Sequence, residues 1–247
     1  MSIDITLLCC PDCGGQSSLK LNQNNHNLHC TTCNNEYAYN NGVPIFLDTT
    51  TINANQVSGQ QTAISSIKQA LHKITRPRHH SIYFDTLESS LQNGIELDKF
   101  IQDFSNKSNV LNVGSLAKQL TKKDVNIINL DISHYNNIDV VADAHRIPIK
   151  DGSLDGIIIK NVFEHIREPI VVRDELFRTL KKGGRIYAKV PFMQPFHAVP
   201  NDFQRYTING LKEFFKDFKV LKHGIAIGPS STISSVSYTH LTLPTKA

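Results

Sequence analysis

Three short apolar segments, each with a polar residue at or next to its end, decide the fold of this chain: Asn129-Leu130-Asp131, Val140-Val141-Ala142-Asp143-Ala144 and Ile157-Ile158-Ile159-Lys160-Asn161. Continuous runs of Val, Ile and Leu that do not alternate with polar residues are typical of strands buried on both faces of a parallel sheet. Open α/β sheets bind their ligands at the carboxyl ends of such strands. The segments therefore predict a sheet on which Asp131 and Asp143 face a ligand.

Strands and helices alternate around this centre. We predict strands over residues 110–113, 125–130, 138–142, 154–159, 185–190 and 220–227. Amphipathic patterns predict a helix over residues 84–104 and another that begins at Pro169. The second helix is expected to end at Lys181-Lys182-Gly183-Gly184, because cations and glycine favour helix C-termini. The alternation indicates a Rossmann-like doubly wound, mainly parallel α/β sheet.

Composition places few limits on function. The 247 residues are 40% hydrophobic and 19% charged, which is ordinary for a globular protein with one core and a small satellite domain. No apolar run reaches the roughly 18 residues of a membrane span, and no signal peptide is recognisable, so we expect a cytoplasmic protein. The net charge of +4 neither requires nor excludes a nucleic-acid partner, and residues 72–80 form the only basic cluster. The sequence specifies no oligomeric state.

Four of the five cysteines form two Cys-x-x-Cys pairs. Cys10 and Cys13 form the first pair and Cys30 and Cys33 the second, with sixteen residues between them. Four thiolates in two such knuckles are the ligand set of a tetrahedral structural zinc site. Cys9 is the spare thiol, since the two-residue gap favours Cys10. All five cysteines precede residue 34, which favours a metal site over a disulfide framework.

The cysteine segment reads as a small module. A strand over residues 36–40, a turn at Asn41-Gly42 and a returning strand follow the second knuckle. Two knuckles followed by Gly-Val-Pro-Ile-Phe-Leu at residues 42–47 resemble the Trm112-type zinc ribbon, which occurs fused to or partnered with methyltransferases. We expect a zinc ribbon over residues 1–50, a linker over 51–75 and a catalytic domain over 76–235. In a module this small, the metal is expected to replace a hydrophobic core.

The strand ends also indicate a nucleotide cofactor. A dinucleotide fold has Gly-x-Gly-x-x-Gly after its first strand, and here only Gly114 is present. Asp131 is placed to accept both ribose hydroxyls, a feature shared by NAD-binding and S-adenosylmethionine-binding folds.

The sequence at the end of the third predicted strand distinguishes between these two cofactors. Asp143-Ala144-His145-Arg146-Ile147-Pro148, followed by Leu154-Asp155, resembles class I methyltransferases of the type 11-like kind. The motif at residues 161–166 and the Leu-Lys-Lys-Gly-Gly run at 180–184 also match. The resemblance implies that Asp143 and Ala144 contact the adenine of S-adenosylmethionine. It implies a cofactor site made of Gly114, Ser115, Asp131, Ile132, Asp143, Ala144 and Asn161.

One position departs from that family. Leu116 stands where a second glycine normally lets the backbone approach the methionine part of the cofactor. The departure leaves open a protein in which cofactor binding is weakened or lost.

The acceptor side is expected in the segment after the strand at 185–190. His197, Asp202, Arg205 and Tyr206 lie there, before a helix that Thr207 is expected to cap. The segment resembles methyltransferases of polysaccharide and glycan assembly. His197 is the best candidate for a general base, with His165 behind it. Asp202, Arg205 and Tyr206 are the candidate substrate residues, although Arg205 is equally able to pair with Asp202.

The end of the chain is expected to be foreign. Residues 236–247 resemble the translation of a common sequencing adapter and are excluded from the fold. The family implies one more helix and an antiparallel strand after the strand at 220–227, so we expect the edge of that strand to be exposed.

The resulting hypothesis is an S-adenosylmethionine-dependent methyltransferase acting on an oxygen or nitrogen of a small molecule or glycan precursor, with zinc in its ribbon. An rRNA or tRNA base methyltransferase and a catalytically inactive binding protein remain the alternatives.

Overall fold

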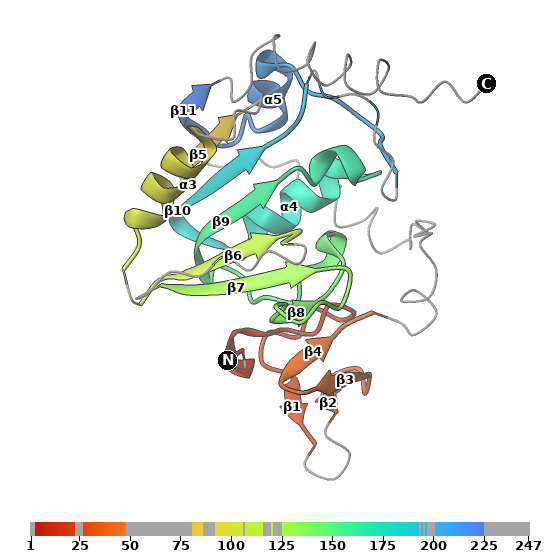
Figure 1. Cartoon of the computed structure of the whole chain (residues 1–247). Helices are drawn as coiled ribbons and strands as arrows, with labels where there is room; N and C mark the ends of the chain where they lie inside the picture. The colour runs from red at the N-terminus through yellow and green to blue at the C-terminus, as the bar shows by residue number, and fades with distance from the viewer. Residues whose placement is uncertain are drawn as a thin grey trace, which may run out of the picture.

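The computed structural model describes residues 3–22, 27–47, 81–85, 92–105, 107–115, 120, 125–192, 194, 196 and 201–224. Within them the strands form one sheet in the order β1-β2-β3-β4-β8-β7-β6-β9-β10-β5-β11 (Figure 1). Its centre is built from β6 (Asn109–Val113), β7 (Asn126–Asp131), β8 (Val140–Val141), β9 (Leu154–Lys160) and β10 (Leu180–Lys189). Every pairing among these five is parallel, which confirms the predicted mainly parallel, Rossmann-like sheet.

Helices cover both faces of the sheet. Helix α3 (Gln92–Gln102) packs with Val110, Ile158 and Tyr187 on one face. Helices α4 (Pro169–Thr179) and α5 (Ile208–Phe214) belong to the larger core on the other face. Neighbouring residues of one strand point to opposite faces. A strand that is covered on both faces therefore needs apolar residues at consecutive positions.

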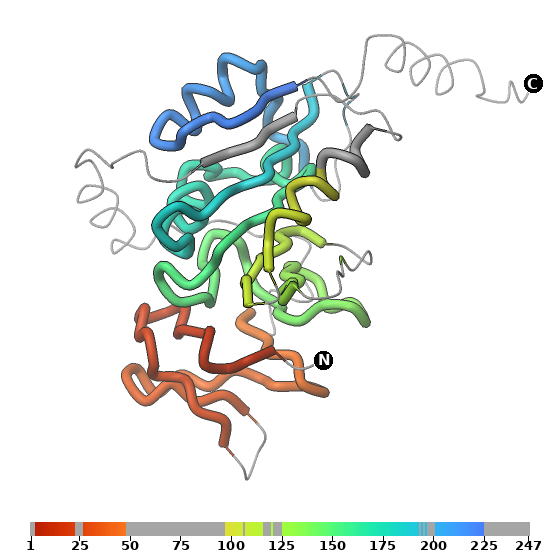
Figure 2. Tube along the Cα trace, turned by 90° about the vertical axis from the view of Figure 1, so that its left-hand side faces the viewer, coloured from red at the N-terminus to blue at the C-terminus, as the bar shows by residue number. Residues whose placement is uncertain are grey.

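The N-terminal module, residues 3–47, is joined to the edge of this sheet. It contains the 3-10 helix η1 (Ile5–Leu7) and strands β1 (Leu19–Leu21), β2 (Leu28–Cys30), β3 (Glu36–Asn40) and β4 (Val43–Ile45). Asn41 and Gly42 form the predicted turn between β3 and β4, both with positive φ. Strand β4 then pairs in parallel with β8, Ile45 opposite Val141. Figures 1 and 2 both show the module against the β8 edge.

The module therefore does not depend on metal alone for a core. Leu8, Leu28 and Tyr37 belong to the same hydrophobic cluster as the central strands. Main-chain bonds reinforce the contact, because Cys9 N donates to Pro148 O at 3.1 Å and Lys150 N donates to Leu7 O at 3.0 Å. The expectation of a separate module whose metal replaces a core is wrong in this respect.

A strand that precedes the central strands in the sequence lies near the other edge of the sheet. Strand β5 (Ser81–Asp85) lies between β10 and β11 (Lys219–Gly224) and is parallel to both. The helix expected over residues 84–104 is thus too long, since its first residues belong to β5 and α3 begins at Gln92. One edge of β11 is covered by β5. Because β11 is the last strand in the sheet order, its other edge has no strand beside it among the described residues, as expected.

The end of α4 also differs from prediction. The helix ends at Thr179, and Lys181 to Gly184 already belong to β10. Leu180 pairs with Leu154, and the register shifts before Arg185 pairs with Gly156. The run Lys-Lys-Gly-Gly is therefore an irregular start of a strand, where Gly183 adopts φ +83°.

The linker over residues 51–75, the basic cluster at 72–80 and the C-terminal residues 236–247 lie outside the described residues. In the part of the chain that the structure describes, no helix is long and apolar enough to cross a membrane.

Candidate functional site: the carboxyl edge of the central strands

The structure brings the predicted cofactor residues to one edge of the sheet. Val113 at the end of β6 lies opposite Leu130 of β7 and Ile159 of β9, and Asp131 lies opposite Val141 of β8. Because the four strands are parallel neighbours, their carboxyl ends meet. Four site residues are placed there, each at or just after one strand end: Gly114, Asp131, Asp143 and Asn161.

Gly114 makes the first turn of the site. Its φ is +65°, and its N–H donates to Leu130 O at 2.9 Å. A Cβ at this position would lie 2.3 Å from Cγ2 of Val162. Both the backbone conformation and the close packing against the end of β9 therefore require glycine.

Ser115 presents a buried hydroxyl to the site. The residue is buried, and its Oγ has no hydrogen-bond partner among the described residues. A buried hydroxyl in that state costs about 1–3 kcal/mol. The site thus fits a polar ligand group beside the Gly114 turn. Leu116 lies outside the described residues.

A buried amide pair that sequence reasoning missed holds these strand ends together. Asn112 Nδ2 donates to Asn129 Oδ1 at 2.9 Å, and both residues are buried. Asn129 in turn donates from its main-chain N to Asp139 Oδ2 at 2.8 Å and from Nδ2 to the same oxygen at 3.1 Å. The signal was present in the sequence, because asparagine inside an apolar strand must find a partner when it is buried.

Asp131 closes β7 as predicted. Its side chain is buried, and Oδ1 accepts a hydrogen bond from Ser133 N at 2.9 Å. The next residue, Ile132, is 43% exposed, so it offers an apolar surface at the rim. A carboxylate fixed beside an apolar surface suits the hydroxyls and the ring of a nucleoside.

Asp143 begins the 3-10 helix η2 (Ala144–Arg146) as its N-cap. Its Oδ1 accepts from His145 N at 2.9 Å and lies 2.6 Å from His145 Nδ1. Burial works to raise the pKa of Asp143, but the hydrogen bond and charge of His145 outweigh it and leave the pKa below its usual range. Burial likewise works to lower the pKa of His145, and Asp143 overcomes it and raises that pKa. Ala144 is buried against the same turn.

The segment after η2 is held from both sides. Arg178 of α4 donates to Ile147 O at 2.7 Å and to Ile149 O at 2.8 Å. On the other side Leu8 of the N-terminal module forms an isolated antiparallel bridge with Ile149. Because the chain is fixed just beyond it, the turn that carries Asp143 is fixed in place relative to the sheet.

Asn161 ends β9 in a left-handed conformation. Its φ is +53°, which asparagine tolerates better than most residues, and its N–H donates to Lys189 O at 2.9 Å. The bend turns the chain into the 3-10 helix η3 (Phe163–His165) at the acceptor side.

The acceptor side is anchored to η3 by residues 201–206. Phe203 N donates to Glu164 O at 2.7 Å, and Gln204 Nε2 donates to Phe163 O at 2.8 Å and to Ile166 O at 2.9 Å. Gln204 is a second residue that the sequence analysis missed, because one amide that satisfies two loop carbonyls leaves no pattern in the sequence.

Arg205 is paired within this segment. It donates from Nη2 to Asp202 Oδ2 at 2.6 Å and from Nη1 to Asp202 Oδ1. The Asp202 side chain is only 2% exposed. Of the two roles considered for Arg205, the pairing with Asp202 is the one that the structure shows.

His165 is engaged at both ring nitrogens. Nδ1 lies 2.5 Å from Asn201 O, and Nε2 lies 3.8 Å from Oε1 of the fully buried Glu164. Burial, with the charge of Glu164 added to it, raises the pKa of Tyr206 to about 12, so its phenol is neutral at physiological pH. His197 lies outside the described residues.

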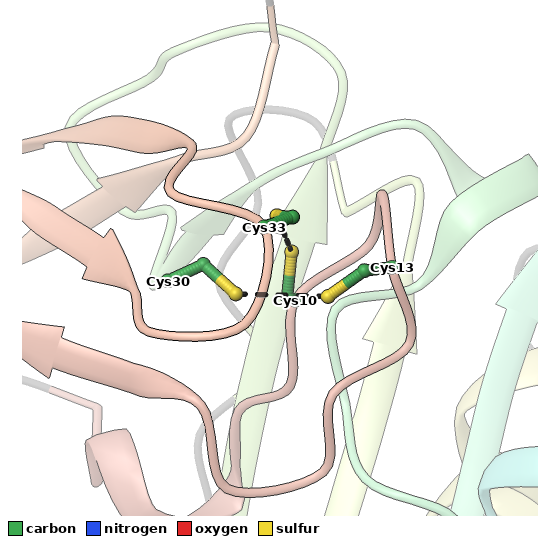
Figure 3. Close-up of side chains that lie close together, drawn as sticks. All are labelled: Cys10, Cys13, Cys30 and Cys33. Atoms are coloured by element: carbon green, nitrogen blue, oxygen red, sulfur yellow. Dashed lines mark hydrogen bonds between the residues drawn. The ribbon is translucent and has the colours of Figure 1, made fainter.

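The four predicted zinc ligands lie together in the N-terminal module (Figure 3). All four Sγ atoms are within 4.8 Å of one another, and the pairs Cys10–Cys33 and Cys13–Cys30 are each 3.6 Å apart. Ligands about 2.3 Å from a tetrahedral zinc ion are about 3.8 Å from one another, so the cluster fits that ion. Cys9 is separate from the cluster, and burial raises the pKa of its thiol to about 11.

A parallel sheet with fixed polar groups at the carboxyl ends of its central strands defines a Rossmann-like protein that binds a nucleotide cofactor. Residues 111–188 match the family model of the methyltransferase domain. That range runs from β6 to β10 and contains every cofactor residue named above. The chain therefore contains a methyltransferase domain between β6 and β10.

Two solved structures are similar over part of the chain. One is a protein from Methanococcus maripaludis assigned as an S-adenosyl-L-methionine-dependent methyltransferase, with 20% identity, coverage of 54% of this chain and 67% of that one, and a TM-score of 0.32. The other is a SAM-dependent methyltransferase from Aquifex aeolicus, with 18% identity, coverage of 64% of this chain and 88% of that one, and a TM-score of 0.37. Among curated proteins the comparison found no match.

Proposed function

We propose that the protein methylates an oxygen or nitrogen of a small molecule or glycan precursor. The observation that carries this is the paired state of Arg205, whose guanidinium is held by Asp202 at the acceptor side. A phosphate backbone needs cations that are free to neutralise it. The described rim also offers exposed aromatic rings, Phe192 at 43% and Phe203 at 44% exposure, the latter with Arg167 at 5.5 Å from its centre, and such rings suit a ring-shaped acceptor.

In this proposal the carboxyl edge holds S-adenosylmethionine, whose sulfonium supplies an activated methyl group. Gly114 and Ser115 hold the methionine part, Asp131 the ribose hydroxyls, and Asp143 with Ala144 the adenine. Ile132 and Asn161 complete the rim. The contribution of these residues is alignment, because an in-line displacement depends mainly on the position of the two reacting atoms.

We assign His197 as the general base that takes the proton of the acceptor. An acceptor hydroxyl or amine loses its proton as it gains the methyl group, and an imidazole titrates in the physiological range. The bonds of His165 support this choice, since Nδ1 is bound to Asn201 O and Nε2 points to Glu164. His165 then serves to link η3 to the acceptor segment.

Calorimetry with S-adenosylhomocysteine tests the cofactor side. The wild-type protein should bind it, and Asp143→Ala should weaken binding at least tenfold through the loss of one charge-assisted hydrogen bond. Asp174→Ala, which removes a carboxylate on α4 that pairs with its neighbour Arg173, is the matched control. Equal affinity of wild type and Asp143→Ala would refute this cofactor site.

Transfer of a labelled methyl group separates the acceptor classes. The label should enter a pool of small molecules or glycan precursors and not total RNA. Filter binding to RNA over a salt series adds a second measurement, because an RNA enzyme shows affinity that falls steeply with salt. Labelled RNA together with such a salt dependence would replace this proposal with the RNA alternative.

The cysteine cluster is assigned a structural zinc ion. Four thiolates fill the tetrahedral shell, so the ion would hold the module in shape and take no part in methyl transfer. Purified protein should contain about one zinc per chain by atomic absorption, and Cys13→Ser should lose most of it. Cys9→Ser is the control and should keep its metal. Equal zinc loss in both variants would show that the ligand set is wrong.

A further inference from the structure

Among the residues that the structure describes, His145 is the titratable side chain that contacts the proposed adenine-binding carboxylate. It donates to Asp143 from the main chain at 2.9 Å and lies 2.6 Å away through Nδ1, and both contacts go to the same oxygen, Oδ1. The two side chains are partly exposed, 23% for His145 and 26% for Asp143. The pair therefore lies at the surface of the site, within reach of a ligand.

The second oxygen of Asp143 is in a different state. Oδ2 has no hydrogen-bond partner among the described residues, while Oδ1 already accepts two donors. A carboxylate held at one oxygen in this way cannot turn freely about its last bond. Its remaining oxygen keeps one direction and accepts only from a group that brings an N–H or O–H.

We propose that His145 is a specificity-determining positioning residue, which orients the Asp143 carboxylate so that the site accepts a 6-amino purine and rejects a 6-oxo purine. The inference rests on the proposed cofactor site, because it takes the adenine to lie at Asp143. An exocyclic amine donates to Oδ2, whereas a 6-oxo group only accepts and would face a second acceptor.

Two consequences of removing the His145 side chain follow from the site. Oδ1 would keep only the main-chain donor, so the carboxylate would regain rotation. The pKa of Asp143 would rise, because the side-chain hydrogen bond and the charge of His145 are lost while the main-chain bond and the charge of Arg146 remain. A carboxylate that is free to turn is able to move its oxygens away from a 6-oxo group, so selectivity between the two purines would fall. Arg146 and Glu168 also face His145, and both stay unchanged in the variants described next.

The experiment compares two ligands on four proteins by calorimetry at pH 7: S-adenosylhomocysteine and its deamination product S-inosylhomocysteine. Wild type should prefer the adenine ligand by about 100-fold, the selectivity of a site with one unmatched charge-assisted hydrogen bond. His145→Asn should keep that ratio, because the asparagine amide carries its donor near the place of Nδ1. His145→Leu, of similar shape but without a donor, should lower the ratio to about tenfold or less. His145→Ala also lacks the donor, and it replaces His145→Leu in the comparison if the leucine disturbs the fold.

The outcomes separate this inference from the proposed function. Failure of wild type to bind either ligand overturns both. If wild type binds and prefers the adenine ligand but the variants without the donor keep the full ratio, the role of His145 is refuted and the cofactor site stands. Equal weakening toward both ligands, with an unchanged ratio, would show that His145 only supports the local structure.

Discussion

The cofactor side and the acceptor side of this site lie on one sheet edge but satisfy their polar groups differently. On the cofactor side, Ser115 Oγ and Asp143 Oδ2 have no partner among the described residues. On the acceptor side, Arg205 is bonded to Asp202, and His165 is bonded to Asn201. The two oxygens named on the cofactor side are open to a ligand, whereas Arg205 and His165 on the acceptor side fix the shape of the rim beside the fully buried carboxylate of Glu164.

This difference predicts how variants of the two halves should behave. Changes on the cofactor side should affect ligand affinity more than stability, and changes on the acceptor segment should do the reverse. Gly114 is the exception that affects both, because it belongs to the backbone of the site.

The largest effect is expected for Gly114→Val. A side chain there meets Val162 at 2.3 Å and must adopt φ +65°, which together should cost about 2–4 kcal/mol of stability. S-adenosylhomocysteine should bind at least 100-fold more weakly in calorimetry, because the turn has to move. Gly183→Val on β10 is the control, since Gly183 also has a positive φ of +83° but a Cβ there meets nothing within 4 Å. Near-normal binding by Gly114→Val would mean that the turn is not part of the site.

Asp202→Asn tests the acceptor half. It removes the charge that holds Arg205, and we expect a loss of about 2–3 kcal/mol in the free energy of unfolding measured by urea titration. Affinity for S-adenosylhomocysteine should stay within about twofold of wild type, because this pair supports the rim and not the cofactor. A large loss of cofactor affinity with unchanged stability would reverse the proposed division.

Ser115→Ala should show the opposite behaviour. Removing a buried hydroxyl without a partner should leave stability unchanged or raise it by up to about 1 kcal/mol in the absence of ligand. Affinity for S-adenosylhomocysteine should fall about five- to tenfold, the value of one hydrogen bond. A variant that is less stable but binds normally would show that Ser115 serves the fold alone.

The smallest effect is the pH dependence contributed by Asp143 and His145. The pKa of Asp143 is lowered in the folded protein, so its stabilisation is present above its unfolded pKa of about 4 and is lost as the pH falls through the folded pKa. The pKa of His145 is raised, so its stabilisation is present below about pH 6.5 and is lost as the pH rises through the folded pKa. The pair should therefore contribute most between about pH 4 and 6.5.

Melting temperatures of wild type and His145→Asn over pH 4 to 9 would measure this contribution. The difference between the two proteins should be largest in the acidic window and should decrease above neutral pH. A difference that does not change with pH would mean that the histidine charge contributes nothing.

Much of the fold followed from short segments of sequence. The runs at 110–113, 125–130 and 154–159 became β6, β7 and β9 within one residue at each end, because mainly apolar runs of this length have few alternatives to a buried strand. The two Cys-x-x-Cys pairs met in space as predicted, and Thr207 caps α5 through Oγ1 to Gly210 N at 3.0 Å. In each case the signal and the structure lie within a few residues of each other.

Long-range pairing was not predictable in this way. Strand β5 lies between β10 and β11, and β4 pairs with β8, although more than ninety residues separate Ile45 from Val141. The bonds that join strands are main-chain bonds, which every residue except proline is able to make, so they leave no trace in the side-chain pattern. The sequence alone determined the parallel core, its cofactor edge and the cysteine ligand set. Only the tertiary structure decided that the module is part of the sheet and that Arg205 is paired, since each depends on which groups meet in space.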